Sequence, residues 1–318
     1  MAAAVNAADY RSMKLGSVPR RRIYGSDIAG QVVAVGKNCR RFKIGDEVLG
    51  DISEHGLGGF AEYVAVPEAP LVLKPPAVSF VGAAALTISA VTAVQALQNP
   101  GNIQPGQRVL ICGTGGGVGT FAVQLAKYFG AEVTAVCGFA NSPLMKSLRA
   151  DHIINYQEQT LAQLNLHFDV ILAIHGNYPL ATYKRLLKPG GVCVVVCGAI
   201  SQIMKVLLFG RFYSFGSQKI QVLRAKPDAG DLDFVVKLFE AGTIKPIVDK
   251  ILPLAETASA MEYISGGHAR GKVVVSYVLV PRFGAWHQNV TNSTYRSPLG
   301  SRREPFYNRL FSSFARMG

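Results

Sequence analysis

Residues 107–127 join an apolar strand to a helix through a turn made almost entirely of glycine. The segment reads QRVLICGTGGGVGTFAVQLAK. Such a turn lets backbone N–H groups approach an anion, and it begins a helix whose N-terminal end carries partial positive charge. A side chain at Gly113, Gly116 or Gly119 would block the anion or hold the helix away from the strand. The spacing, between a strand and a helix, therefore predicts a site for the pyrophosphate of a dinucleotide; a flexible loop is the alternative.

Strand-like and helix-like segments alternate from residue 109 to residue 225. Strands are predicted at 109–112, 132–137, 152–155, 168–175, 192–198 and 219–225, and helices at 118–129, 142–148, 178–187 and 201–209. This alternation is typical of an α/β fold with a doubly wound parallel sheet. Short strands between glycine turns are predicted before it, at 30–35, 47–49 and 60–66, and after it, at 247–252 and 272–279. The outer segments indicate a smaller, barrel-like β domain to which the chain returns.

Composition limits the class of protein. With 318 residues, of which 49% are hydrophobic and 17% charged, the chain can bury a large core and form two domains. The longest apolar runs, at 80–96 and 191–199, are interrupted or short, so we predict no membrane span. The five cysteines lack the spacing of a disulfide framework or of a zinc site, which predicts reduced, buried thiols. No secretory signal is visible, so the cytoplasm is the expected location, and a basic segment ahead of residue 23 makes the mitochondrion the alternative.

The net charge of +13 is distributed unevenly. The last 38 residues carry six arginines and one glutamate. Charge alone would allow binding to nucleic acid or to an anionic membrane surface, but the sequence contains no recognisable nucleic-acid-binding module. We therefore expect no nucleic-acid partner, and a basic, disordered tail over residues 281–318.

A series of short phrases follows the chain from residue 5 to residue 275. They are VNAADYRSMKLG (5–16), GSDIAGQVVAVG (25–36), FKIGDEVLG (42–50), GGFAEYVAVP (58–67), AAALTISAVTAVQAL (83–97), GTGGGVGTFAVQLAK (113–127), LKPGG (187–191) and HARGKVVV (268–275). In this order they resemble the medium-chain dehydrogenase/reductase superfamily and, within it, the zinc-independent quinone oxidoreductase-like enzymes. The resemblance implies a Rossmann dinucleotide-binding domain at 93–242 and a GroES-like catalytic domain formed by 1–92 and 243–280. Relatives have one or two strands ahead of this first phrase, so we expect an N-terminally truncated small domain with an open sheet edge.

Zinc separates the branches of this superfamily. Zinc-dependent relatives carry a cysteine where Ala7 and Ala8 lie, and a His-Glu pair where Ser26 and Asp27 lie. A catalytic zinc needs three protein ligands, which Asp27 alone does not provide, and the four-cysteine lobe of a structural zinc is absent between residues 59 and 96. We therefore expect no metal, and without a Lewis acid the reduction of a conjugated electrophile is favoured over alcohol oxidation.

The resemblance implies transfer of a hydride from the nicotinamide to a quinone or to an α,β-unsaturated carbonyl. It places Asn6 and Asp9 near the nicotinamide, with Tyr10 beside them as a hydroxyl donor. Each of the three also has a purely structural explanation, since Asn and Asp cap turns and tyrosines brace walls. The alternative function is a catalytically idle descendant, a nucleotide-binding or interaction protein.

The expected cofactor is NADPH, with NADH as the alternative. Residues 137–142, which follow the second strand, offer neither the acid typical of an NAD site nor the Arg or Lys typical of an NADP site. Without an acid to repel it, a 2′-phosphate is tolerated. By resemblance we also expect a homodimer through the edge strand at 219–225. The expected cofactor-binding residues are Thr92, Gly113, Thr114, Gly115, Gly116, Gly117, Val118, Gly119, Asn141, Ser142, Tyr156, Ile174, His175, Gly176, Cys197, Gly198 and Ala199.

Overall fold

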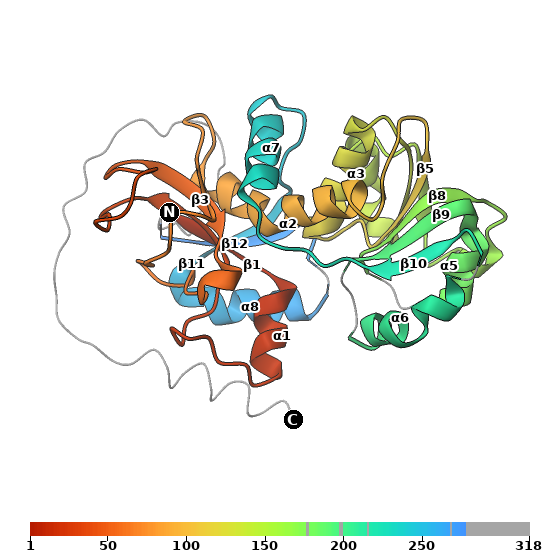
Figure 1. The fold of residues 1–318 in the computed structure, drawn as a ribbon, viewed down its shortest axis with the longest axis horizontal. Helices are drawn as coiled ribbons and strands as arrows, with labels where there is room; N and C mark the ends of the chain where they lie inside the picture. Colours follow the sequence, from red (N-terminus) through yellow and green to blue (C-terminus); the bar gives the residue numbers. More distant parts are fainter. Residues whose placement is uncertain (176–177, 197–199, 215, 268, 278–318) are drawn as a thin grey trace. The chain divides into compact units, whose positions relative to one another are not determined.

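Two six-stranded sheets organise the computed structural model of the protein (Figure 1). The structure describes residues 1–175, 178–196, 200–214, 216–267 and 269–277. Both sheets belong to one compact unit. The tail expected at 281–318 lies outside the described residues.

The parallel sheet, sheet B, confirms the α/β prediction. Its strand order is β10-β9-β8-β5-β6-β7, and every neighbouring pair is parallel. The strands are β5 (Arg108–Cys112), β6 (Glu132–Cys137), β7 (His152–Asn155), β8 (Phe168–Ala173), β9 (Leu187–Val195) and β10 (Lys219–Val222). The order reverses between β5 and β8, and in sheets of this type ligands bind outside the carboxyl ends of the strands at that point.

Alternate residues of a strand in sheet B pack into two separate hydrophobic cores, one on each face of the sheet. Val109 and Ile111 pack on the side that holds α2 (Phe80–Gln98), α3 (Gly117–Tyr128) and α7 (Ala229–Glu240), whereas Leu110 and Cys112 pack on the side of α5 (Leu180–Leu186) and α6 (Ile200–Tyr213). A strand buried on both faces reads as a continuous apolar run, which is how residues 109–112 read in the sequence. Burial also raises the pKa of the Cys112 thiol to about 12.

Helix α2 corrects the prediction that the run near residue 80 is interrupted or short. It has 19 residues with a mean hydropathy of 1.8 in its most apolar window, so its length and composition meet the criteria for a membrane span. However, 83% of that window is buried inside the protein, and the helix packs against α3, α7 and β2 (Asp27–Gln31). We interpret α2 as a core helix that links the two sheets.

Sheet A has the order β11-β12-β1-β2-β3-β4 and draws its strands from both ends of the described chain. Its other strands are β1 (Ala2–Val5), β3 (Glu47–Asp51), β4 (Leu71–Leu73), β11 (Val248–Pro253) and β12 (Lys272–Ser276). Only the β11–β12 pair is parallel. Strand β1, which the sequence analysis did not predict, lies between β12 and β2 and is buried throughout. The domain boundaries at residues 92, 242 and 280 stay predictions.

Two predicted strands of sheet A differ from the structure. The strand expected at 30–35 runs instead over Asp27–Gln31, and residues 60–66 form no strand. Both segments have strand-like sequences, but a strand also needs a neighbour with which its backbone can form hydrogen bonds. None of residues 33–35 or 61–66 forms a backbone–backbone hydrogen bond with another described residue.

The remaining elements are short. They are α1 (Ala7–Lys14), α4 (Ser142–Ser147), α8 (Thr257–Ser265), η1 (Ser53–His55), η2 (Phe139–Asn141), η3 (Leu161–Gln163) and η4 (Leu254–Glu256), the last four being 3₁₀ turns. Helices α1 and α8 pack against each other beside sheet A.

Candidate active site

The glycine turn occupies the space between β5 and α3 in the way its spacing predicts. Gly113 has φ +88°, and a Cβ there would lie 2.5 Å from His175 Cβ, so only glycine fits without strain. A Cβ on Gly119 would overlap the carbonyl oxygen of Gly113, which explains why helix and strand can approach so closely. At Gly116, by contrast, a Cβ would meet no atom of the described residues within 4 Å. Gly116 is the N-cap of α3, so this open space lies at the positive end of a 12-residue helix.

Hydrogen bonds to the second strand hold the inner side of the turn. Thr114 is buried, and both its backbone N–H and its hydroxyl donate to the carbonyl oxygen of Val136, at 3.3 and 3.2 Å. Val118 lies in the first turn of α3 and is half-buried. The turn is therefore rigid on its inner side and partly open on the other.

Asn141 borders the glycine turn from the end of the second strand. A Cβ on Gly115 would lie 2.5 Å from Asn141 Nδ2, and Asn141 Oδ1 is buried without a hydrogen-bond partner among the described residues. A buried acceptor without a donor is costly, so such an atom requires an explanation. Ser142 follows, its hydroxyl 3.9 Å from Cys137 Sγ, and Tyr156 lies over Gly138, 54% exposed. A polar ligand that donates a hydrogen bond to Asn141 Oδ1 would account for the missing partner of this oxygen.

The fourth strand also reaches the turn. The backbone N–H groups of Ile174 and His175 both donate to the carbonyl oxygen of Cys112, at 3.0 Å each. Ile174 is buried and the side chain of His175 is exposed. Thr92 is buried within α2. The expected contacts Gly176, Cys197, Gly198 and Ala199 lie outside the described residues.

Asn6 belongs to a buried polar cluster with Asp27 and Lys272. Lys272 Nζ donates to Asn6 Oδ1 at 2.6 Å and to Asp27 Oδ2 at 3.0 Å, while Asn6 Nδ2 donates to Asp27 Oδ2 at 2.9 Å. Asp27 Oδ1 accepts from the backbone N–H of Ile88 at 3.1 Å. Lys272 is 3% exposed and Asp27 is 0% exposed, so this ion pair is almost completely removed from water. The three side chains come from β12, β2 and the N-cap of α1.

The polar cluster touches the glycine turn. A Cβ on Gly117 would lie 2.7 Å from Lys272 Cδ and 3.0 Å from Ser89 Oγ. The backbone N–H of Gly271, the residue before the lysine, donates to the carbonyl oxygen of Gly115 at 2.8 Å. The N-terminal end of β12 therefore connects the glycine turn, where the dinucleotide is expected, to Asn6.

Asp9 lies behind Asn6 and is 3% exposed. Its Oδ2 accepts from the backbone N–H of Asn6 at 2.8 Å and its Oδ1 from that of Gly25 at 3.3 Å, so both carboxyl oxygens hold the backbone. Burial raises the pKa of Asp9 to about 7, and burial together with the nearby charge of Asp27 raises that of Asp51 to about 6. Tyr10 is half-buried, with Arg11 Cζ and Lys14 Nζ 5.8 and 5.7 Å from its ring centroid.

Sequence reasoning missed Lys272 and Asp27 as members of this site. Asp27 was weighed only as a zinc ligand, and Lys272 appeared only within the phrase HARGKVVV. The one local signal was the position of Lys272, directly after a glycine and at the start of an apolar strand. A lysine that is buried in a strand requires a partner for its charge. Among the described residues, no group of three or more His, Cys, Asp or Glu side chains is arranged to hold a metal ion.

Comparisons with known proteins agree with this arrangement. Residues 1–76 match the model of the alcohol dehydrogenase GroES-like domain, and residues 148–275 match that of the zinc-binding dehydrogenase family. The chain is 32% identical to the chloroplast envelope quinone oxidoreductase homolog of Arabidopsis thaliana, over 80% of this chain and 79% of that protein. It is 34% identical to the 2-methylene-furan-3-one reductase of Solanum lycopersicum, over 86% of this chain and 70% of the relative.

The fold comparison agrees as well. The structure of the quinone oxidoreductase from Coxiella burnetii matches with a TM-score of 0.77 and 28% identity, covering 86% of this chain and 87% of that one. Further relatives, 32% identical over 80% of this chain, are named mitochondrial NAD(P)H oxidoreductases. These matches support a nicotinamide cofactor and a small-molecule substrate. The chain is an oxidoreductase of the medium-chain dehydrogenase/reductase superfamily, and its relatives include quinone oxidoreductase-like proteins.

Proposed function

We propose that the protein is a zinc-independent, NADPH-dependent oxidoreductase that reduces a quinone or an α,β-unsaturated carbonyl. The observation that carries the proposal is the convergence of three features: the open N-terminal end of α3, the orphaned Asn141 oxygen and the buried Asn6–Asp27–Lys272 cluster. The names of the relatives, which include quinone oxidoreductases and an enone reductase, support the choice of acceptor.

The residues of the glycine turn fit a dinucleotide. The backbone at Gly116 and Gly117 would hold the pyrophosphate at the end of α3, and Asn141 would accept a hydrogen bond from the cofactor. When bound, the nicotinamide supplies the hydride, which the protein directs by holding donor and acceptor in line. The ammonium of Lys272, which is buried beside Asn6, would stabilise negative charge that develops on the oxygen of an acceptor bound there.

The three expected catalytic residues then have three different roles. We assign contact with the acceptor or the nicotinamide to Asn6 and proton donation to Tyr10. Asp9 is a positioning residue, since both of its oxygens hold backbone N–H groups, one of them that of Asn6.

The preference for NADPH rests on residues 138–142, which contain no acidic side chain. An acid at this place would hold the ribose hydroxyls of NAD and would repel a 2′-phosphate. Tyr156 lies beside this segment and is more than half exposed, so its ring is available to the adenosine part of the cofactor.

We further propose a homodimer. Among the described strands β10 pairs only with β9, so it lies at the edge of sheet B, and the neighbouring helix α6 exposes Leu207, Leu208 and Phe209. Unpaired edges and exposed apolar side chains favour association. A cytoplasmic location stays a prediction, and relatives are named chloroplastic or mitochondrial.

The test compares Gly116→Ala with Gly36→Ala in the purified protein. Neither new Cβ would meet an atom of the part of the chain that the structure describes within 4 Å, and neither glycine has a positive φ, so both variants should keep their stability within about 1 kcal/mol. Cofactor affinity is measured by nicotinamide fluorescence, and turnover by NADPH oxidation with 9,10-phenanthrenequinone and with an alkenal. We expect Gly116→Ala to weaken NADPH binding at least tenfold and Gly36→Ala to leave it unchanged.

Each outcome has a distinct meaning. Acceptor-dependent oxidation that is lost in Gly116→Ala supports the reductase. Binding that is sensitive to Gly116→Ala, without turnover of any quinone or enone, supports the alternative of an idle nucleotide-binding protein. Equal affinity of both variants for NADPH would refute the placement of the cofactor.

A further inference from the structure

The far side of helix α6 is apolar and exposed. Met204, Leu207, Leu208 and Phe209 are 46%, 61%, 60% and 51% exposed. Positions i, i+3 and i+4 of a helix lie on one face, so the first three of these side chains form a continuous apolar stripe. Figure 1 shows α6 beside β10 and α5, on the outer side of both. Large apolar side chains gathered on an exposed helix face indicate a surface that another molecule covers.

The opposite face of α6 holds the helix on sheet B. Val206 packs with Ile220 of β10 in the core on that side of the sheet. Gln202 Nε2 donates to the carbonyl oxygen of Tyr178 at 3.2 Å. A Cβ on Gly210 would lie 3.2 Å from the carbonyl oxygen of Ile220, so the glycine lets helix and strand approach closely. The apolar stripe therefore takes no part in holding α6 on the sheet.

The segment around the stripe is basic. From residue 170 to residue 227, a range that contains α5, β9, α6 and β10, the chain holds eight Lys and Arg and no Asp or Glu. Lys205 lies on α6, Lys219 begins β10, and Arg224 follows the end of that strand. All three are exposed, and none forms an ion pair with another described residue. These charges are therefore available to an anionic partner.

Other occupants match this surface less well. A second copy that covered α6 in a symmetric dimer would bring the same basic surface against itself, and residues 281–318, with six arginines and one glutamate, are also basic. Pairing through the β10 edge requires the backbone of that strand and not the far side of α6. A nucleic acid matches the charge but leaves the apolar stripe in contact with water. An anionic lipid surface matches both features.

We propose that α6 docks the protein on an anionic membrane surface. The apolar side chains of the stripe and Phe209 would enter the headgroup region, while Lys205, Lys219 and Arg224 would contact lipid phosphates. The contact is interfacial, because α6 has 14 residues and a helix that spans a bilayer needs about 20.

The test measures co-sedimentation of the purified full chain with vesicles. We expect saturable binding to phosphatidylcholine vesicles that contain about one third phosphatidylglycerol, and at least tenfold weaker binding to phosphatidylcholine alone. Added salt should weaken binding to the anionic vesicles, because it screens the lysines and arginines. Leu208→Trp, in a chain whose single tryptophan is removed by Trp286→Phe, should shift its emission to shorter wavelength when vesicles are added.

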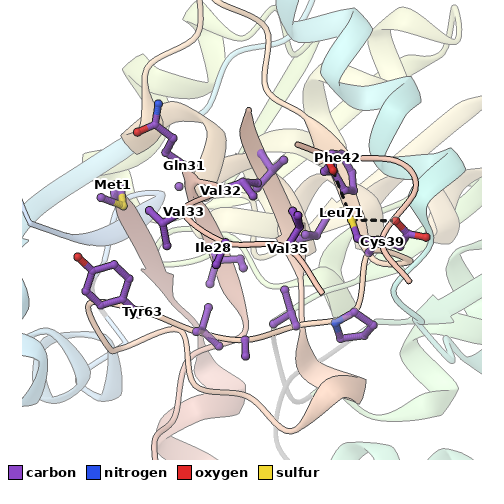
Figure 2. A pocket seen from close by; sticks show the side chains of 18 of the residues that line it. Met1, Ile28, Gln31, Val32, Val33, Val35, Cys39, Phe42, Tyr63 and Leu71 are labelled. Atoms are coloured by element: carbon purple, nitrogen blue, oxygen red, sulfur yellow. Dashed lines mark hydrogen bonds between the residues drawn. The ribbon is translucent and has the colours of Figure 1, made fainter. Parts of the chain in front are cut away.

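Matched variants separate the stripe from other exposed apolar positions. Leu208→Asp places a charge on the stripe, whereas Val33→Asp places one in a separate hollow beside sheet A, where Figure 2 shows Val33 near Met1 and Tyr63. Val33 is 53% exposed, so both variants should fold, and only Leu208→Asp should lower vesicle affinity, by tenfold or more. Lys205→Glu should also lower it at least tenfold, and Lys205→Arg should retain it.

Four results would overturn the proposal. The first is absence of binding to the anionic vesicles. The second is equal binding by Leu208→Asp and Val33→Asp, which would assign the lipid contact to another basic segment, such as residues 281–318. The third is a DNA duplex that displaces the vesicles and binds Leu208→Asp as tightly as wild type, which would identify a nucleic acid as the partner. The fourth is a dimer that Leu208→Asp dissociates, without vesicle binding, which would identify a second copy.

Discussion

Asp9→Asn should change how the stability of this protein depends on pH. Burial raises the pKa of Asp9 from 3.8 to about 7 in the folded protein. Between these two values the folded state holds a proton that the unfolded chain has lost, so stability falls as pH rises through that window. Each pH unit is worth about 1.4 kcal/mol, so the wild-type protein should lose about 3 kcal/mol through Asp9 between pH 5 and pH 7 and little more above it.

The asparagine variant carries no ionisable group at this position, so it should lack this contribution. Its amide oxygen keeps one of the two backbone hydrogen bonds, and the loss of the longer one, to Gly25, costs about 1 kcal/mol at every pH. The stability of Asp9→Asn relative to wild type should therefore rise by about 3 kcal/mol from pH 5 to pH 8. Urea denaturation at the two pH values measures this as a relative shift of the midpoint on the order of 1 M.

The matched control is Asp51→Asn, because burial raises the pKa of Asp51 only to about 6. Between pH 5 and pH 8 the stability of Asp51→Asn relative to wild type should rise by about half as much, because one pH unit rather than two lies between pH 5 and the folded-state pKa of Asp51. If Asp9→Asn and wild type showed the same pH dependence, the carboxyl would be ionised in the folded protein near pH 5, and the assignment of a desolvated, proton-holding Asp9 would be wrong.

Three further perturbations address the site itself. Lys272→Met should destabilise the protein by about 3–5 kcal/mol in urea denaturation, because it leaves Asp27 buried without its cation. Adding Asp27→Asn to the same chain should recover a large part of that loss. No recovery would show that the lysine acts through packing alone. Asn141→Asp should weaken NADPH binding at least tenfold relative to NADH, whereas the exposed control Asn38→Asp should leave the ratio unchanged. Tyr10→Phe should lower kcat by about 10²-fold with the acceptor KM little changed, and an unchanged kcat would remove Tyr10 from the chemistry.

Local patterns were sufficient for most of sheet B. The strands at Glu132–Cys137 and His152–Asn155 have the predicted ends, and the glycine turn leads from β5 into α3 as its spacing indicates. These features depend on residues close in sequence: an apolar run, a turn that requires glycine, and a helix that begins there. Strand ends near β8, β9 and β10 were less accurate, because the last residues of a strand depend on how far its neighbour extends.

Sheet A shows where local patterns were insufficient. Residues 60–66 have the composition of a strand, yet no strand in the described residues pairs with them, whereas the short AAAV segment of β1 forms a strand because β12 and β2 flank it. Pairing is a contact between distant parts of the chain, and residue type alone does not reveal it.

By itself, then, the sequence determined the doubly wound sheet, the glycine turn and the family, since these are written in short segments with a fixed spacing. Only the tertiary structure decided that Lys272 reaches Asn6 and Asp27 across intervals of 266 and 245 residues, and that residues 60–66 form no strand in the described part of the chain. The physical reason is the same in both cases. A buried charge and an unpaired backbone are defined by what surrounds them, and the surroundings come from elements far away along the chain.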